Sequence, residues 1–236
     1  MKTIIQIKQI NIKKTEKNYT ANKNKTKITM SFIVFLMLQI ILIGSNSSAQ
    51  NLSLLKIGDV IFHKSQSAQS KALNEATGSP WTHVGIIVKD SKGRWSVAEA
   101  IGPVKITPLS TFIGRGKNKH FRIYRHPEFD PTSMTDKLYA AIKKHNKAYD
   151  IYFEFSDERT YCSELVYKAM MEVMGREVGH IQKMKEMKLT GPYVKALIKK
   201  RLTDTGRELN PDEPIITPVS QLLDNRIVFI QGNSGI

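Results

Sequence analysis

Cys162 is the only cysteine in this chain of 236 residues. A lone cysteine cannot form an intramolecular disulfide, and it cannot supply the two or more thiolates of a cysteine-rich zinc site. The fold must therefore be held together by a hydrophobic core. The 41% hydrophobic content and the length are those of a globular domain that can bury such a core.

The first 49 residues differ in character from the rest. Residues 31–44 form an almost wholly apolar run, which follows a Lys- and Asn-rich stretch ending at Met30 and precedes a few small residues ending at Ala49. This is the layout of a signal peptide, because the apolar core is only about half the roughly 20 residues of a membrane-spanning helix. We expect a basic leader and signal peptide over 1–49, cleaved after Ala49, and one folded domain over 50–236. An uncleaved anchor is the alternative.

A signal peptide implies export to the periplasm or cell envelope. The membrane is then contacted only through the signal segment before cleavage. Either Met1 or Met30 can be the true start, because the stretch before Met30 is long for the front of a signal peptide.

The net charge of +15 belongs partly to the leader. Residues 1–49 hold eight Lys and one Glu, a charge of +7, which leaves +8 for the remaining residues. There the Lys and Arg residues are scattered over several predicted helices, with no basic stripe interleaved with aromatic residues. We therefore expect no nucleic-acid partner.

The domain reads as a mixture of strands and helices. We expect strands over 57–62, 83–89, 94–101, 120–126 and 226–230, helices over 65–77, 131–148, 160–174 and 181–201, and a polar loop containing Gly114 and Gly116 before the strand at 120. The simplest assembly is an α+β domain with a three- or four-stranded antiparallel sheet packed by helices.

Cys162 lies at the start of one of these helices. Thr160 is the expected N-cap, which places the cysteine in the first turn, where free N–H groups and the helix dipole favour a sulfur anion. These are conditions for a thiol nucleophile. The alternative is a small buried hydrophobic residue, because Cys162 is also the first residue of the helix's apolar stripe.

His83 and Glu99 lie on the two arms of a predicted hairpin. If the turn pairs Lys89 with Gly93, His83 lies directly opposite Glu99, with the Cβ atoms about 5 Å apart. If Lys89 pairs with Arg94 instead, the two side chains point to opposite faces. A three- or five-residue turn, or a bulge, keeps them on one face, and the sequence leaves the choice open.

Five motifs in order resemble those of a known family. The strings IGDVIF, SPWTHVGIIV, VAEA, TYCSELVYKA and ITPVSQLLD, spread over residues 56–230, are similar to the YiiX-like permuted papain-like amidases of the NlpC/P60 superfamily. The resemblance implies a circularly permuted papain-like fold, in which the histidine precedes the cysteine. It implies that Cys162 is the nucleophile, that His83 is the general base and acid, and that Glu99 orients the imidazole.

Three neighbouring residues are candidates for substrate binding. Tyr161 can line the site or assist the oxyanion, or it can simply pack over the helix start. Trp81 can form a pocket wall or pack in the core. Glu164 can face a cationic substrate group or support the helix start.

The other histidines and glycines indicate no further chemistry. The remaining five histidines lack metal-ligand spacing, so they are expected at the surface or at strand ends. Gly114-Arg115-Gly116 is a fragment of a phosphate-loop pattern without its preceding strand or third glycine. We therefore expect no metal and no organic cofactor.

The expected function is that of an exported cysteine amidase or peptidase. It would act through an acyl-enzyme on a small peptide or amide, with a cell-envelope origin suggested by analogy. One alternative is a lipid acyltransferase or hydrolase resembling lecithin:retinol acyltransferases, with Met184, Met187 and Leu189 forming an apolar lid rather than core. The other is a non-catalytic envelope-binding module.

Overall fold

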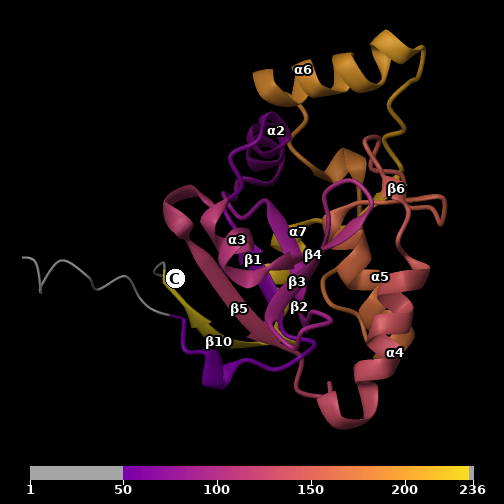
Figure 1. Ribbon diagram of the computed structural model, residues 1–236. Helices are drawn as coiled ribbons and strands as arrows, with labels where there is room; N and C mark the ends of the chain where they lie inside the picture. The colour runs from indigo at the N-terminus through magenta and orange to yellow at the C-terminus, as the bar shows by residue number, and fades with distance from the viewer. Residues whose placement is uncertain (1–49, 234–236) are drawn as a thin grey trace, which may run out of the picture. The chain divides into compact units, whose positions relative to one another are not determined.

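The computed structural model describes residues 50–233 (Figure 1). The expected leader, signal peptide and cleavage position after Ala49 lie outside the described residues. Within the described range, no helix has both the length and the apolar character needed to cross a bilayer.

A six-stranded antiparallel sheet lies at the centre of the domain, with the strand order β10-β5-β1-β2-β3-β4. Its strands are β1 (Val60–His63), β2 (His83–Lys89), β3 (Trp95–Ala100), β4 (Val104–Pro108), β5 (Phe121–Arg125) and β10 (Val228–Gly232). The expected α+β class with an antiparallel sheet is confirmed. The expected number of three or four strands is wrong.

The segment before β5 accounts for part of this difference. It was expected to be a polar loop, yet it contains β4, α3 (Leu109–Gly114) and the 3-10 turn η2 (Lys117–Lys119). β4 and α3 have only five and six residues, too few for a clear period of two or 3.6. β4 is also an edge strand that leaves Ile106 exposed, so it lacks the apolar run of a buried strand.

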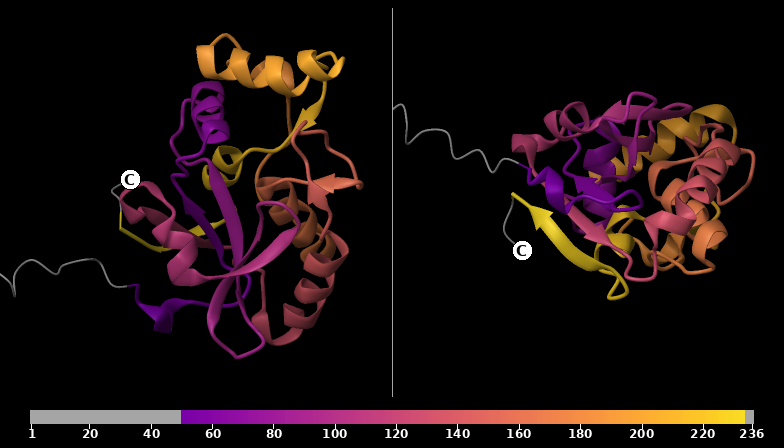
Figure 2. Two further views of the ribbon diagram at one scale, coloured as in Figure 1. Left: turned by 45° about the horizontal axis from the view of Figure 1, so that its top comes forward. Right: turned by 60° about the horizontal axis from the view of Figure 1, so that its bottom comes forward.

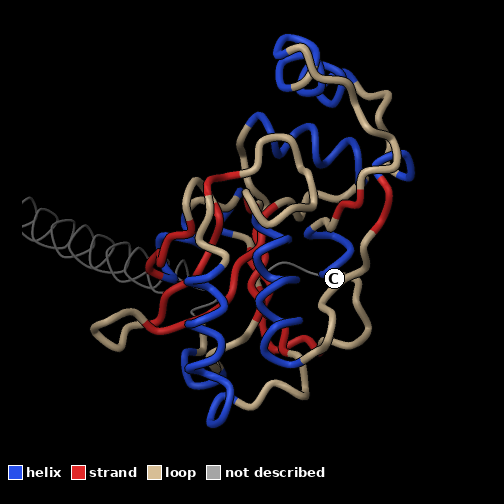
Figure 3. Tube along the Cα trace, turned by 90° about the vertical axis from the view of Figure 1, so that its right-hand side faces the viewer, coloured by secondary structure: helices blue, strands red, loops and turns tan. Residues whose placement is uncertain are grey.

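Helices cover both faces of the sheet. The helices within residues 50–233 are α2 (Ala68–Thr77), α3, α4 (Pro131–Lys144), α5 (Cys162–Met174), α6 (Pro192–Arg201) and α7 (Pro218–Leu222). On one face α4 and α5 lie side by side (Figure 3), and Val166 of α5 packs with Ile86 of β2 in the main core. On the other face Phe112 of α3 packs with Ile61 and Ile87. Burial on both faces explains the continuous apolar runs of β1 and β2.

The expected helical segment 181–201 is helical in its second half only. Its first residues form β8 (Gln182–Lys183), paired with β9 (Pro214–Ile215), and the 3-10 turn η3 (Met184–Glu186). Helix α6 starts at Pro192, because proline fits the first helical position but not a helix interior. It packs across α2 (Figure 2).

Four further short elements belong to the fold. β6 (Ala148–Tyr149) and β7 (Arg159–Thr160) form a parallel pair directly before α5, and η1 (Leu52–Leu54) and η4 (Thr203–Thr205) are 3-10 turns. In the β6–β7 pair Tyr149 lies beside Thr160. This pairing brings Tyr149 close to the start of α5.

Candidate active site

Cys162 is the first residue of α5 and follows β7 closely. The N-cap is Tyr161 rather than the expected Thr160, because Thr160 still pairs with Tyr149 in the β6–β7 sheet. Cys162 nevertheless stands in the first turn, where backbone N–H groups lack intrahelical partners and the dipole favours an anion. Cys162 is only 4% exposed. The residue is therefore both buried and located at the helix N-terminus.

The β2–β3 hairpin brings His83 and Glu99 to one face of the sheet. Lys89 pairs with Trp95, so the turn is the five-residue one that keeps the two side chains on the same face. Continued along the strands, this register places Gly85 rather than His83 opposite Glu99. His83 and Glu99 therefore meet diagonally across the two strands.

Gly85 leaves the space that this diagonal contact uses. A Cβ atom on Gly85 would lie 2.4 Å from Val97 Cγ1, 2.8 Å from the carbonyl oxygen of Ala98 and 3.4 Å from Glu99 Cβ. A side chain at this position would push β3 away. Glycine is thus required here for close approach of the strands.

Glu99 is completely buried between two cationic partners. Its Oε2 accepts a hydrogen bond from His83 Nε2 at 2.7 Å, and its Oε1 accepts one from the Arg115 guanidinium. Burial alone would raise the pKa of Glu99. The hydrogen bond and charge of His83, with smaller contributions from Thr107 and Arg115, instead hold this pKa below its ordinary value. Glu99 is therefore an anion.

The His83 imidazole lies between Glu99 and Cys162. Burial would lower the pKa of His83, but the charge of Cys162 and a hydrogen bond to it, followed by those of Glu99, raise this pKa to about 9. Because Glu99 engages Nε2, Nδ1 is left for the sulfur. The imidazole can therefore hold a proton beside the sulfur, supported by the buried Glu99 carboxylate.

The raised pKa predicts a specific pH dependence of stability. Folded His83 binds its proton more tightly than unfolded His83, so its contribution to the free energy of unfolding is complete below pH 6.5 and is lost as the pH rises towards 9. We expect the urea midpoint to fall between these pH values, and to fall less in His83→Gln. The same decline in both proteins would contradict the assignment. His120→Gln, at a partly buried histidine outside this triad, is the control.

His63 and Phe112 lie against His83. His63 pairs with His83 in the β1–β2 register, with ring centroids 4.9 Å apart, and the Phe112 ring lies 4.6 Å from His63 and 5.6 Å from His83. Burial, then the charges of His83 and Arg115, lower the pKa of His63 to about 3, so this ring is neutral at physiological pH. His63 does end a strand, as expected, but it is buried rather than at the surface.

Arg115 is a site residue that the sequence analysis missed. It follows α3, and its guanidinium reaches both Glu99 and the ring of Phe112, at 5.7 Å from the ring centroid. The sequence showed only an arginine between two glycines in a presumed loop. No local pattern indicates that this loop lies beside β3, so the contact depends on the fold alone.

A polar cleft of about 290 Å³ opens beside His83. Arg115, Tyr149, Gln69 and several Ser and Thr side chains line it together with His83. The Tyr149 hydroxyl accepts a hydrogen bond from Gln69 Nε2 at 2.7 Å. Burial, then the charge of Cys162, raise the pKa of Tyr149 above its ordinary value. His83 and Tyr149 both line the cleft, and the charge of Cys162 raises the pKa of both, so the cysteine lies close behind these two residues although it is not itself a lining residue.

The three predicted substrate-binding residues do not line this cleft. Tyr161 is buried, and its hydroxyl accepts a hydrogen bond from the Ile216 backbone N–H at 3.1 Å. Trp81 is buried in the main core under the Arg122 guanidinium. All three make packing or helix-start contacts, and their substrate roles stay predictions.

Glu164 supports the start of α5. Its Oε2 accepts the Tyr161 backbone N–H at 3.3 Å, and its Oε1 pairs with Lys168 at 2.9 Å. Burial raises the pKa of Glu164 to about 7, although Lys168 acts in the opposite direction.

Within residues 50–233, no three His, Cys, Asp or Glu side chains are grouped as a metal site would require. We therefore derive no step through a metal.

The sheet, the helix that begins at the cysteine and the order of histidine before cysteine define the class of permuted papain-like proteins. Residues 54–223 match the model of a family described as permuted papain-like amidase enzyme, YaeF/YiiX, C92 family, and the chain belongs to this family. YiiX, an uncharacterized protein of Escherichia coli K12, is 38% identical over 162 residues, covering 68% of this chain and 78% of its own. The crystal structure of metalloprotein YiiX from Escherichia coli O157:H7 is similar with a TM-score of 0.70 and 34% identity, over 75% of this chain and 97% of that one.

Proposed function

We propose that this protein is an exported cysteine amidase or peptidase that cleaves a small peptide or amide through an acyl-enzyme. The observation that carries the proposal is the buried Glu99–His83 hydrogen bond beside Cys162. The charge of Cys162 and a hydrogen bond to it, followed by those of Glu99, raise the pKa of the imidazole to about 9 against the effect of burial. A proton held this firmly beside a thiol at a helix N-terminus favours the thiolate as nucleophile. Membership of an amidase family supports the reaction class.

In the first step, the Cys162 thiolate attacks the amide carbonyl carbon and the C=O electron pair moves to oxygen. The oxyanion faces the free N–H groups of the first turn of α5. As the intermediate collapses, the C–N bond breaks and His83 gives its proton to the leaving amine. The products of this step are a free amine and a thioester on Cys162.

In the second step, water hydrolyses the thioester. Neutral His83 takes a proton from the water, whose oxygen attacks the thioester carbonyl. The C–S bond then breaks, which releases a carboxylic acid and restores the thiolate–imidazolium pair. Glu99 holds the imidazole in one orientation throughout and stabilises its cationic form.

Tyr149 is a candidate second donor to the oxyanion. Its hydroxyl accepts the Gln69 hydrogen bond, which leaves its own proton available to the cleft. Burial keeps this phenol protonated, because its pKa is raised. Such a donor is typically worth about 10²–10³-fold in kcat.

The compartment and the substrate belong to the proposal as well. The signal-like leader supports export, and an exported amidase would act on amides of the cell envelope, such as a peptidoglycan stem fragment. The same order of motifs supports placement in the NlpC/P60 superfamily.

The lipid and binding-module alternatives have less support. Met184, Met187 and Leu189 belong to packed clusters near α2 and α6, and none of them lines the polar cleft. Met184 is buried, Met187 and Leu189 are partly buried, and all three line a separate apolar pocket of about 60 Å³, so they do not form a lid over His83. A purely binding role would leave the buried Glu99 and its two cationic partners without a function in the cleft.

Alkylation of the thiol tests the proposed activation. An ordinary thiol, with a pKa of about 8.5, is about 1% ionised at pH 6.5, whereas a thiolate–imidazolium pair is largely ionised. We expect iodoacetamide to label Cys162 about 10- to 100-fold faster in the wild type than in His83→Gln at this pH, as followed by mass spectrometry. His120→Gln should react like the wild type. Equal, slow labelling in all three proteins would refute the proposal.

A further inference from the structure

A second cleft continues the polar cleft beside His83. It also measures about 290 Å³, and it shares Ser65, Ser70 and Thr82 with the first. Because three lining residues are common to both, the two clefts form one groove. We call this the cationic groove, because positively charged side chains are among the residues that line it.

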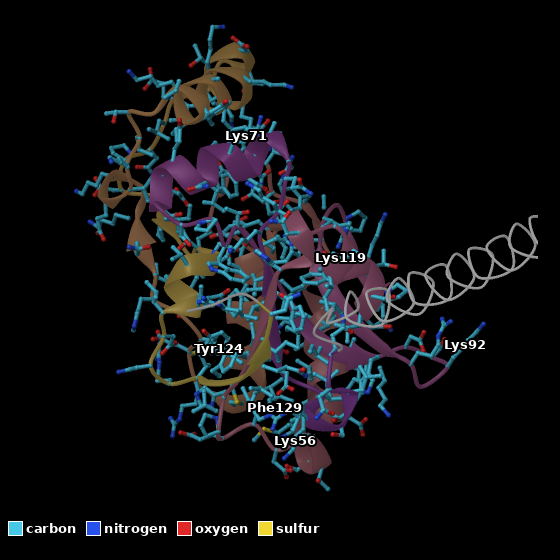
Figure 4. The ribbon with its side chains drawn as sticks, turned by 90° about the vertical axis from the view of Figure 1, so that its left-hand side faces the viewer. Lys56, Lys71, Lys92, Lys119, Tyr124 and Phe129 are labelled. Atoms are coloured by element: carbon cyan, nitrogen blue, oxygen red, sulfur yellow. The ribbon has the colours of Figure 1, made fainter. Side chains whose placement is uncertain are left out.

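The cations of the groove come from segments that are distant in sequence. Arg115 and His83 line its first part, and Lys64, Lys71 and Lys117 line its second. The Lys117 backbone N–H donates to the Lys64 carbonyl at 2.8 Å, which ties the loop after α3 to the end of β1. Lys71 belongs to α2 (Figure 4). The fold thus surrounds one hollow with positive charge from three elements.

Arg115 and His83 are paired with Glu99, but the three lysines are not neutralised from within the described residues. No Asp or Glu is among the lining residues of either cleft, and none of the three lysines forms an ion pair within residues 50–233. Lys64 lies 3.3 Å from His120 Nδ1 and 4.9 Å from the Trp81 ring centroid, and Lys71 lies 5.3 Å from the Tyr193 ring centroid.

Lys64 and Lys117 also repel one another. Burial, then the charges of Arg122 and Lys117, lower the pKa of Lys64. Like charges held together without a counter-ion destabilise the free protein, and a bound anion relieves this repulsion. The hydroxyls of Ser65, Ser70 and Thr82 add neutral donors between the two parts of the groove.

We propose that the cationic groove binds an anionic segment of the substrate, so that the preferred substrate is a peptide or amide carrying at least two carboxylate or phosphate groups on one side of the scissile bond. This inference rests on the proposed function, because it places the scissile amide of the substrate at Cys162. The rest of the substrate then extends from there into the cationic groove. The amide lies at Cys162 and His83, and the anionic groups lie along Lys64, Lys71 and Lys117.

Binding without chemistry tests this inference separately from the reaction. The full chain carrying Cys162→Ala is titrated by calorimetry with a triglutamate peptide, a triglutamine peptide and a tripeptide containing two phosphoserines. At an ionic strength of about 20 mM we expect the triglutamate or phosphoserine peptide to bind about tenfold tighter than triglutamine, and this advantage to shrink strongly at about 200 mM. The tighter of the two anionic peptides identifies carboxylate or phosphate as the preferred group.

Two charge-matched variants locate the effect. The groove variant combines Lys64→Gln, Lys71→Gln and Lys117→Gln, and the control variant combines Lys92→Gln, Lys137→Gln and Lys143→Gln. The control lysines are exposed and line neither cleft, and Lys92 lies at the hairpin tip, far from Lys71 (Figure 4). We expect the anion preference to be lost in the groove variant and kept in the control.

Two results would overturn the inference: equal binding of triglutamine and both anionic peptides, or an anion preference that persists in the groove variant. Neither result bears on the thiol, because the titrated protein lacks it. Slow, His83-independent alkylation of Cys162 would instead refute the proposed reaction, whatever the peptides bind.

Discussion

Replacing Cys162 with alanine should abolish amide hydrolysis while leaving the fold intact. The sulfur is the nucleophile whose charge and hydrogen bond act on His83, and loss of such a group typically costs about 10⁴-fold or more in turnover. The side chain is small and nearly buried, so the free energy of unfolding should change by no more than about 1–2 kcal/mol. Turnover is measured on muropeptides, aminoacyl amides and acyl-lipid esters, and stability by urea unfolding.

The three substrate classes also separate the functional alternatives. Turnover of muropeptides or aminoacyl amides supports the amidase, whereas turnover of acyl-lipid esters alone favours the lipid enzyme. Cys162→Ser is a matched variant, because it keeps the size of the side chain but replaces a readily ionised thiol with a hydroxyl. Full activity in Cys162→Ala would refute a cysteine mechanism.

Replacing Glu99 with glutamine should produce the second largest loss. The amide removes the charge that stabilises the imidazolium, and it can present a donor rather than an acceptor to His83 Nε2. We expect kcat/KM to fall by about 10²–10⁴-fold, as it does when a triad carboxylate is neutralised. The alkaline limb of the pH profile, expected near pH 9 in the wild type, should move to lower pH because one of the causes of the raised His83 pKa is gone.

The fold must be checked in this variant, because Glu99 is fully buried and also holds Arg115. Losing one partner of a buried ion pair destabilises a protein by about 3–5 kcal/mol, so urea unfolding is measured in parallel. Arg115→Gln is the matched comparison: it removes the second partner of Glu99 and leaves the His83 contact in place. A shift of the alkaline limb in Arg115→Gln as large as that in Glu99→Gln would contradict the role assigned to the His83 hydrogen bond.

The local patterns predicted the parts of the site that short segments carry. The apolar stripe and the glycine after Met174 indicated α5, so Cys162 was expected in a first helical turn, and it lies there. The two β-rich runs of β2 and β3, with a polar turn between them, indicated the hairpin. Its register stayed open because a change of one residue in the turn reverses the face of Glu99, and nothing in the turn residues selects among the possible lengths. In the structure the turn has five residues, and in this register the backbone of Gly85 lies close to that of Ala98.

The residues that the sequence analysis missed come from contacts between distant segments. Arg115 reaches Glu99 because α3 folds back over the sheet, and Tyr149 reaches the cleft because β6 pairs with β7. The lysines of the groove appear scattered along the chain, and no stripe of charge precedes or follows any of them. Only the assembled fold places them around one hollow.

The amino-acid sequence by itself determined that the segments of β1, β2, β3, β5 and β10 are strands and that those of α2, α4 and α5 are helices. It also determined the order of histidine before cysteine and the helical start at Cys162. These properties depend on hydrophobic periodicity and capping, which act over a few residues. The tertiary structure alone decided the diagonal contact of His83 with Glu99, the second partner Arg115 and the gathering of positive charge beside the thiol. Each of these depends on strand register and on the packing of segments far apart in the chain, where a displacement of one residue changes which side chains meet.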